Sequence, residues 1–198
     1  MSEKHKQPQS DFLKSQRMEV EEAEARTRAL FIRHQAEKKT RRQPATSNNQ
    51  LIKATPEQIY VALTNPDMLV RWQVPGEMTG QIHAFDLREG GGYTMSLRYP
   101  ESEKVMKGKS SEREDRFIAR FLILEPPHRL MEAVQFDTAD PAFGGEMIMD
   151  IQLKAQPGGT KVTFAFYDLP SGIKPEDNEA GTRSSLSKLA ALLERQPR

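Results

Sequence analysis

Alternation of apolar and polar residues with a period of two is the main signal in the second half of the chain. Apolar residues occupy every second position in four segments, at 93–99, 117–123, 147–153 and 162–166. Such alternation is typical of strands that bury one face. Residues 117–124 are apolar at all but one position, so we expect this strand to be covered on both faces for part of its length. Short connections such as Gly158-Gly159 predict antiparallel pairing.

Helical patterns frame these strands. Pro56 suits the first turn of a helix that Thr55 can cap, and the Asn-Pro-Asp sequence at 65–67 ends this helix and begins a short second one. Near the carboxyl end, one apolar helical face is formed by Leu186, Leu189, Ala190 and Leu193. A sheet with one apolar face needs such a cover. The pattern predicts an α+β fold: a curved antiparallel sheet of about seven strands wrapped around a long C-terminal helix, with two short helices after the first strand.

The amino-terminal region differs from the rest. Residues 11–39 contain no proline or glycine, and acidic residues at 19–24 precede basic residues at 33–42, which complements a helix dipole. Its apolar residues form no continuous helical stripe. We predict a polar, helix-prone or disordered extension over residues 1–45 and a domain over residues 46–196. A docking helix for a partner or a second copy is the alternative for the extension, and Met18 is an alternative start of translation.

Composition narrows the function classes. The chain of 198 residues has 29 Lys and Arg against 28 Asp and Glu, and residues 51–198 hold 18 basic and 21 acidic side chains. A mildly acidic domain lacks the concentrated basic face that nucleic-acid binding requires. The chain has no cysteine, and its histidines at 5, 34, 83 and 128 lack ligand spacing, so we expect no metal and no cofactor. No apolar run approaches the ~20 residues of a membrane span, and the start lacks a signal peptide's apolar stretch, which predicts a cytoplasmic protein.

Two glycine motifs resemble phosphate sites without their context. Three glycines at 90–92 are followed by a strand pattern, whereas a phosphate cradle needs a helix there, so they predict a hairpin turn. Gly108-Lys109-Ser110 lacks the upstream glycine of a nucleotide-binding loop. Asp86 and Arg88 are two positions apart, and we interpret them as a structural surface pair rather than as ligand contacts.

The inward-facing apolar residues are the candidate ligand contacts. The predicted contacts are Trp72, Tyr93, Met95, Phe121, Met147, Met149, Phe164, Phe166, Leu186 and Leu189. Methionine and aromatic side chains adapt to varied apolar ligands, although the same set also suits a filled core. For Trp72, the only tryptophan, the alternative is a cap that packs the short helices onto the sheet. No nucleophile motif is present, and we expect no catalytic residue, although strand residues such as Tyr93 and Tyr99 are candidates for acid–base work.

Several of these segments together resemble a known superfamily. The segments are I-K-A-T-P-E-Q-I-Y at 52–60, A-L-T-N-P directly after Val61, Trp72, and F-D-L-R-E-G-G-G-Y at 85–93. They resemble the START-like (SRPBCC, birch-pollen-allergen-like) superfamily, in the branch named after the activator of heat-shock-protein ATPase. The resemblance covers about residues 46–194 and implies the helix-grip fold.

The resemblance also implies a function. It implies non-catalytic binding of a small apolar or amphipathic molecule between the sheet and the C-terminal helix, in a monomer or homodimer. A chaperone-associated interaction domain is the alternative, and a cyclase-type enzyme is less favoured. The eukaryotic co-chaperones activate the ATPase with a separate domain, which is larger than residues 1–49. The family's C-terminal helix often opens with Gly-Trp, whereas this chain has Gly181-Thr182.

Overall fold

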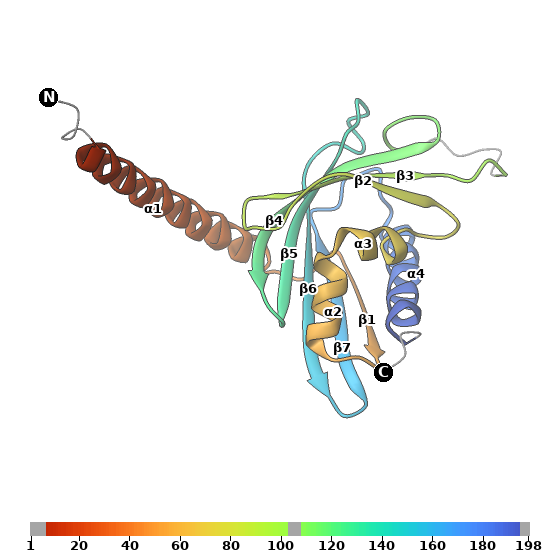
Figure 1. The fold of residues 1–198 in the computed structure, drawn as a ribbon. Coiled ribbons are helices and arrows are strands. Elements are labelled where there is room, and N and C mark those ends of the chain that lie inside the picture. Colours follow the sequence, from red (N-terminus) through yellow and green to blue (C-terminus); the bar gives the residue numbers. More distant parts are fainter. Residues whose placement is uncertain (1–6, 103–107, 195–198) are drawn as a thin grey trace, which may run out of the picture.

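The computed structural model describes residues 7–102 and 108–194. Its body is a seven-stranded antiparallel sheet in the order β1-β7-β6-β5-β4-β3-β2, which curves around a C-terminal helix (Figure 1). The strands are β1 (Thr46–Ile52), β2 (Thr79–Asp86), β3 (Gly92–Arg98), β4 (Glu114–Glu125), β5 (Arg129–Phe136), β6 (Met147–Gln156) and β7 (Gly159–Tyr167). The helices are α1 (Gln7–Lys39), α2 (Pro56–Thr64), α3 (Pro66–Trp72) and α4 (Pro175–Glu194). The predicted α+β helix-grip architecture is confirmed.

Local sequence sets the two short helices. The Thr55 hydroxyl accepts a hydrogen bond from the Gln58 backbone N–H at 3.3 Å, and the Gln58 side chain accepts one from the Thr55 N–H at 2.9 Å. This reciprocal capping box fixes the start of α2. The Asn65 side chain in turn accepts from the Asp67 N–H at 2.9 Å and begins α3. The predicted helix boundaries are confirmed because each proline lies where its missing N–H costs nothing.

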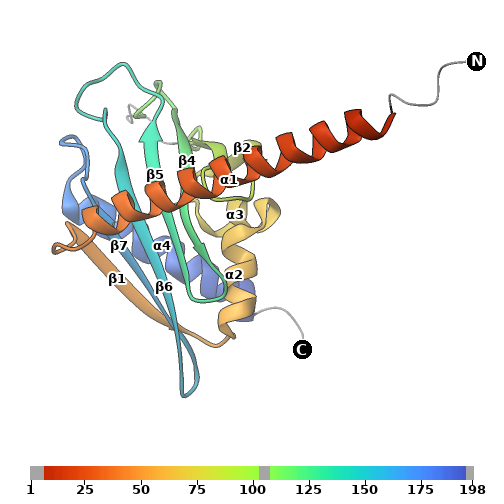
Figure 2. The same ribbon diagram turned by 90° about the vertical axis from the view of Figure 1, so that its left-hand side faces the viewer.

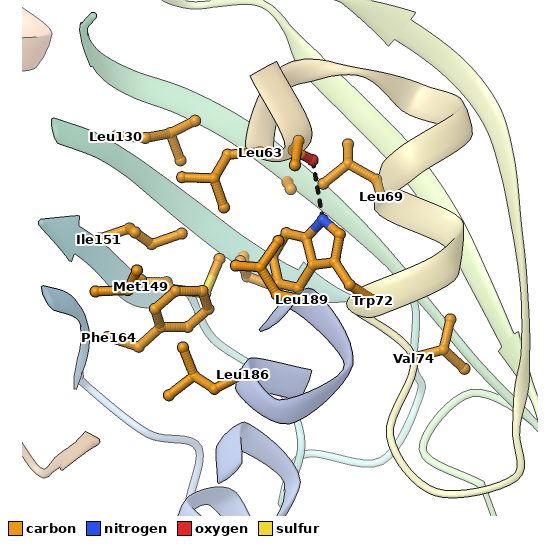
Figure 3. Packing of buried hydrophobic residues seen from close by; sticks show 14 of the residues in the cluster. Leu63, Leu69, Trp72, Val74, Leu130, Met149, Ile151, Phe164, Leu186 and Leu189 are labelled. Atoms are coloured by element: carbon orange, nitrogen blue, oxygen red, sulfur yellow. Dashed lines mark hydrogen bonds between the residues drawn. The ribbon is translucent and has the colours of Figure 1, made fainter. Parts of the chain in front are cut away.

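The sheet buries apolar side chains on both faces. The concave face, with α2, α3 and α4, encloses the main core, in which Trp72, Met149, Phe164 and Leu189 lie together (Figure 3). A second cluster lies on the outer face, where α1 crosses the strands on the side opposite α4 (Figure 2). It comprises Leu122, Ile123, Met131, Ala133, Ile148, Ala165 and Tyr167, with Ile32 and Ala36 of α1. The sheet is therefore the middle of three layers.

A bulge in β4 changes one expectation from the alternation pattern. The pattern placed Ile123 on the same face as Phe117 and Phe121, and this was wrong. The register shifts between Phe121 and Ile123, so that Phe121 opposes Glu132 and Ile123 opposes Met131. The extra residue sends Ile123 to the outer cluster. The strand is covered on both faces for part of its length, as the sequence predicted.

The triple glycine forms the tight connection between β2 and β3. Gly92 has φ +157°, and a Cβ atom there would lie 2.0 Å from the Ala119 carbonyl oxygen of β4. Only glycine fits this close approach of two backbones. Arg88 lies in the turn, and its Nε is 2.8 Å from Oδ2 of Asp86 with both side chains exposed. This is the predicted structural pair.

The helix α1 is attached to the sheet through its last turns. The guanidinium of Arg33 contacts the Glu125 carboxylate, and Lys39 Nζ lies 3.4 Å from Oε1 of Glu146. Its amino-terminal part projects away from the body (Figure 1). The predicted border between extension and domain falls in the connection between α1 and β1. Residues 1–6 and 195–196 of the predicted ranges lie outside the described residues.

Candidate ligand-binding site

A cavity of about 230 Å³ lies between the concave face of the sheet and the first half of α4. Its apolar wall is formed by Trp72, Pro75, Leu97, Phe117, Val134, Phe136, Met147, Met149, Phe164, Phe166 and Ile173. Its polar wall is formed by Gln73, Lys109, Asp115, Asp177, Asn178, Thr182 and Ser185, beside Gly181. The cavity thus presents both apolar and polar side chains to one occupant.

The ten predicted contact residues divide into two groups. Trp72, Met147, Met149, Phe164 and Phe166 line the cavity. The other five are buried in the same core but do not line the cavity: Tyr93, Met95, Phe121, Leu186 and Leu189. In Figure 3, Leu186 and Leu189 of α4 lie against Phe164 and Trp72, so this part of the interface is occupied by protein side chains.

Trp72 combines the two roles that the sequence left open. Its Nε1 donates a hydrogen bond to the Ala62 carbonyl oxygen at 2.9 Å, which ties the end of α3 to α2 (Figure 3). Its ring meets the Phe164 ring edge-to-face at a centroid distance of 5.9 Å. The indole therefore packs the helices onto the sheet and forms part of the cavity wall.

An ion pair lies in the polar wall. Asp115 of β4 is 2% exposed and accepts hydrogen bonds from the Lys109 backbone N–H at 2.6 Å and the Tyr99 hydroxyl at 3.1 Å. The Lys109 ammonium also pairs with this carboxylate and lies 5.1 Å from the centre of the Phe136 ring. Several donors thus offset the cost of burying the Asp115 charge. The Gly108-Lys109-Ser110 sequence gave no indication of this role for Lys109.

The first turns of α4 supply small polar groups. The Thr182 hydroxyl donates to the Asn178 carbonyl oxygen at 2.8 Å, and the Ser185 hydroxyl donates to the Gln73 carbonyl oxygen at 3.3 Å. Gly181 and Thr182, which stand where the resemblance implied Gly-Trp, both line the cavity.

A buried acid lies beside the cavity and was missed by sequence analysis. Glu132 of β5 is 1% exposed, and its neighbours Val134 on the same strand and Met149 on β6 line the cavity. Its Oε2 accepts a hydrogen bond from the Tyr93 hydroxyl at 3.1 Å, and Gln73 Nε2 donates to the same hydroxyl at 2.8 Å. The inward register of Glu132, between Leu130 and Val134, was the signal that could have revealed it.

Burial shifts the protonation of this pair. Removal from water raises the pKa of Glu132 to about 8, against a smaller lowering by the Tyr93 hydrogen bond. Burial and the nearby Glu132 charge hold the pKa of Tyr93 well above its ordinary value. Neither residue lines the cavity, but the Tyr93 hydroxyl joins Glu132 to Gln73, which does.

Comparison with known families decides the family of this chain. The family model described as activator of Hsp90 ATPase homolog 1-like protein matches residues 53–194. The chain belongs to this family. The match spans the two short helices, the six strands β2 to β7 and the closing helix, and thus the whole cavity.

Solved structures share the fold. Protein CV1439 from Chromobacterium violaceum is 29% identical, with a TM-score of 0.67, over 76% of this chain and 96% of that one. A protein from Rhodobacter sphaeroides is 24% identical, with a TM-score of 0.60, over 79% and 98% of the two chains. An AHSA1-like protein from Aeromonas hydrophila is 23% identical, with a TM-score of 0.56, over 77% and 96%. Comparison with curated proteins returns no significant match.

Over residues 7–102 and 108–194, no group of three or more His, Cys, Asp or Glu side chains is arranged to hold a metal ion. No helix in this part of the chain is long and apolar enough to cross a membrane.

Proposed function

We propose that this domain binds, without catalysing a reaction, a small amphipathic molecule in the cavity between the sheet and α4. The observation that carries the proposal is the mixed lining of the cavity. Aromatic and methionine side chains of α3, β6 and β7 line it together with the Lys109–Asp115 pair and polar side chains from the first turns of α4. A volume of about 230 Å³ favours a ligand smaller than the occupants of typical pockets of roughly 300–1,000 Å³.

The arrangement favours binding over catalysis. Tyr93, one of the two tyrosines considered for acid–base work, does not line the cavity, and Tyr99 binds the buried Asp115. Among the described residues, two acidic side chains line the cavity. Asp115 accepts a hydrogen bond from the Lys109 backbone N–H, and Asp177 lies in the first turn of α4. A cytoplasmic location remains a prediction from the sequence.

A cavity-filling substitution tests the proposal. Thr182→Trp places an indole in the space beside Gly181, and Ser187→Trp places the same ring on the exposed side of α4 as a matched control. A fluorescent apolar probe should bind the wild type and Ser187→Trp with micromolar affinity and lose at least about tenfold in affinity with Thr182→Trp. Native mass spectrometry of the purified protein should show a co-purified small molecule that Thr182→Trp lacks. Equal probe binding by all three proteins would refute this site.

The family match favours a second candidate, a chaperone-associated interaction domain. It rests on the family description alone, whereas the cavity is a feature of this chain. Sedimentation of the domain with an Hsp90-type chaperone separates the two functions. Chaperone binding that persists in Thr182→Trp, together with an empty cavity in the purified wild type, would favour the second candidate.

A further inference from the structure

Most of α1 lies beyond the sheet. The side chains of residues 13–28 are all exposed, whereas Ile32 and Ala36 reach the outer cluster. Five large apolar side chains of this helix are 57–68% exposed: Leu13, Met18, Val20, Leu30 and Phe31. Most helical stability in proteins comes from tertiary packing of one face rather than from intrinsic propensity. Residues 13–28 have no such packing in the single chain.

The two faces of α1 are distinct. The residues that approach the sheet are Ala29, Ile32, Arg33 and Ala36, at helical spacing. On the opposite side of the helix a second row recurs in steps of three and four: Leu13, Gln16, Val20, Ala23, Thr27 and Leu30. This spacing is that of a coiled-coil seam. Every residue of the row is exposed, and a helix packed there would not collide with the sheet.

Charges beside the row favour one partner orientation. When two copies of the row are aligned antiparallel about a point between residues 21 and 22, Leu13 faces Leu30 of the other copy and Val20 faces Ala23. The flanking residues then pair Glu19 with Arg26 and Arg17 with Glu24, each twice by symmetry.

A parallel alignment would instead place Glu19 against Glu24 of the other copy, which is repulsive. Within one helix Arg17 and Arg26 already pair with Glu21 and Glu22, at 2.8 and 3.6 Å. All four side chains are at least 60% exposed, so these intrahelical pairs are weak and free to exchange.

We propose that the projecting part of α1 is a self-association surface, which pairs antiparallel with α1 of a second copy of this chain through the row from Leu13 to Leu30. The contact extends over about 26 Å of helix. It leaves both cavities open, because the two sheets lie on the outer sides of the helix pair. The function of the cavity and the pairing of α1 are therefore independent.

The first test uses the absence of cysteine from the natural sequence. Gln16 and Thr27 face each other in the antiparallel pair and carry none of its large apolar contacts. Mixing full-length Gln16→Cys with differently tagged Thr27→Cys under mild oxidation should give mainly the mixed disulfide. Homodisulfides in place of the mixed product would overturn the antiparallel arrangement, because a parallel pair brings identical positions together.

The second test exchanges charges across the proposed pair. Glu19→Arg and Arg26→Glu should each raise the dimer dissociation constant about tenfold or more by analytical ultracentrifugation, and the double variant should restore it to within a few-fold of wild type. Thr182→Trp should leave it unchanged. A wild-type chain that sediments as a monomer up to millimolar concentration would overturn the proposal, as would a double variant no tighter than either single one.

Discussion

The hydroxyl of Tyr93 lies 3.1 Å from Oε2 of Glu132, and both side chains are at most 2% exposed. Among the described residues, no cation pairs with this carboxylate within salt-bridge distance. A buried acid in such surroundings is kept neutral by the cost of removing its charge from water. The pair therefore links the stability of the cavity wall to pH.

We predict that the free energy of unfolding falls as the pH rises from about 5 to about 8. The folded state keeps the Glu132 proton up to a pKa of about 8, whereas the unfolded chain releases it near the ordinary value of 4.5. Its contribution is thus complete below the unfolded pKa and is lost as the pH rises through the folded one, by up to about 1.4 kcal/mol per pH unit.

Glu132→Gln imitates the neutral acid and should flatten this dependence in urea unfolding at about pH 5, 6, 7 and 8. Glu77→Gln, at an exposed position, is the control and should keep the wild-type slope. If Glu132→Gln keeps the wild-type slope as well, another group causes the pH dependence.

Truncating a side chain in the filled core should lower the free energy of unfolding more than truncating one that lines the cavity. Leu189 is fully buried and does not line the cavity, whereas Met149 does. Both changes to Ala fall in the range of about 2–5 kcal/mol, and we expect Leu189→Ala in its upper half and Met149→Ala in its lower half, because Met149 has fewer neighbours to lose. Denaturant unfolding measures both. The reverse order would mean that the space beside Met149 is filled in solution.

The outer cluster should depend on one alanine of α1. Ala36 is 2% exposed, on the side of α1 that faces the sheet. Ala36→Glu would therefore bury a charge in the outer cluster, which contains Ile123 and Met131. We expect a loss of about 1–3 kcal/mol in unfolding free energy and faster proteolysis within α1. Ala25→Glu introduces the same charge at an exposed position of α1 and should have little effect. Equal behaviour of the two variants would show that the helix does not cover the sheet in solution.

The sequence predicted the fold well because its signals are local and repeated. Alternation identified the strands, and prolines with capping residues placed α2 and α3. The candidate site was harder, because cavity residues and core residues share one alternation pattern. Met95 and Met149 look alike in sequence, and only the arrangement of α4 over the sheet places Met149 in the cavity wall.

The polar groups near the site depend on contacts between distant segments. The Lys109 ammonium pairs with Asp115 across a turn, and the Tyr93 hydroxyl of β3 reaches Glu132 of β5 across the intervening strand β4. Sequence spacing shows neither contact. The role of α1 escaped prediction for a related reason. Its sheet-facing row is short, and its second row is interrupted by Gln16 and Thr27, so neither row gave a continuous stripe.

The bulge in β4 shapes the surface on which α1 packs. It lets two consecutive side chains, Leu122 and Ile123, reach the outer face, while Leu124 returns to the core. A strand that alternated without this interruption would present a packing surface of different shape to α1. The bulge therefore adds both Leu122 and Ile123 to the apolar surface on which Ile32 and Ala36 of α1 pack.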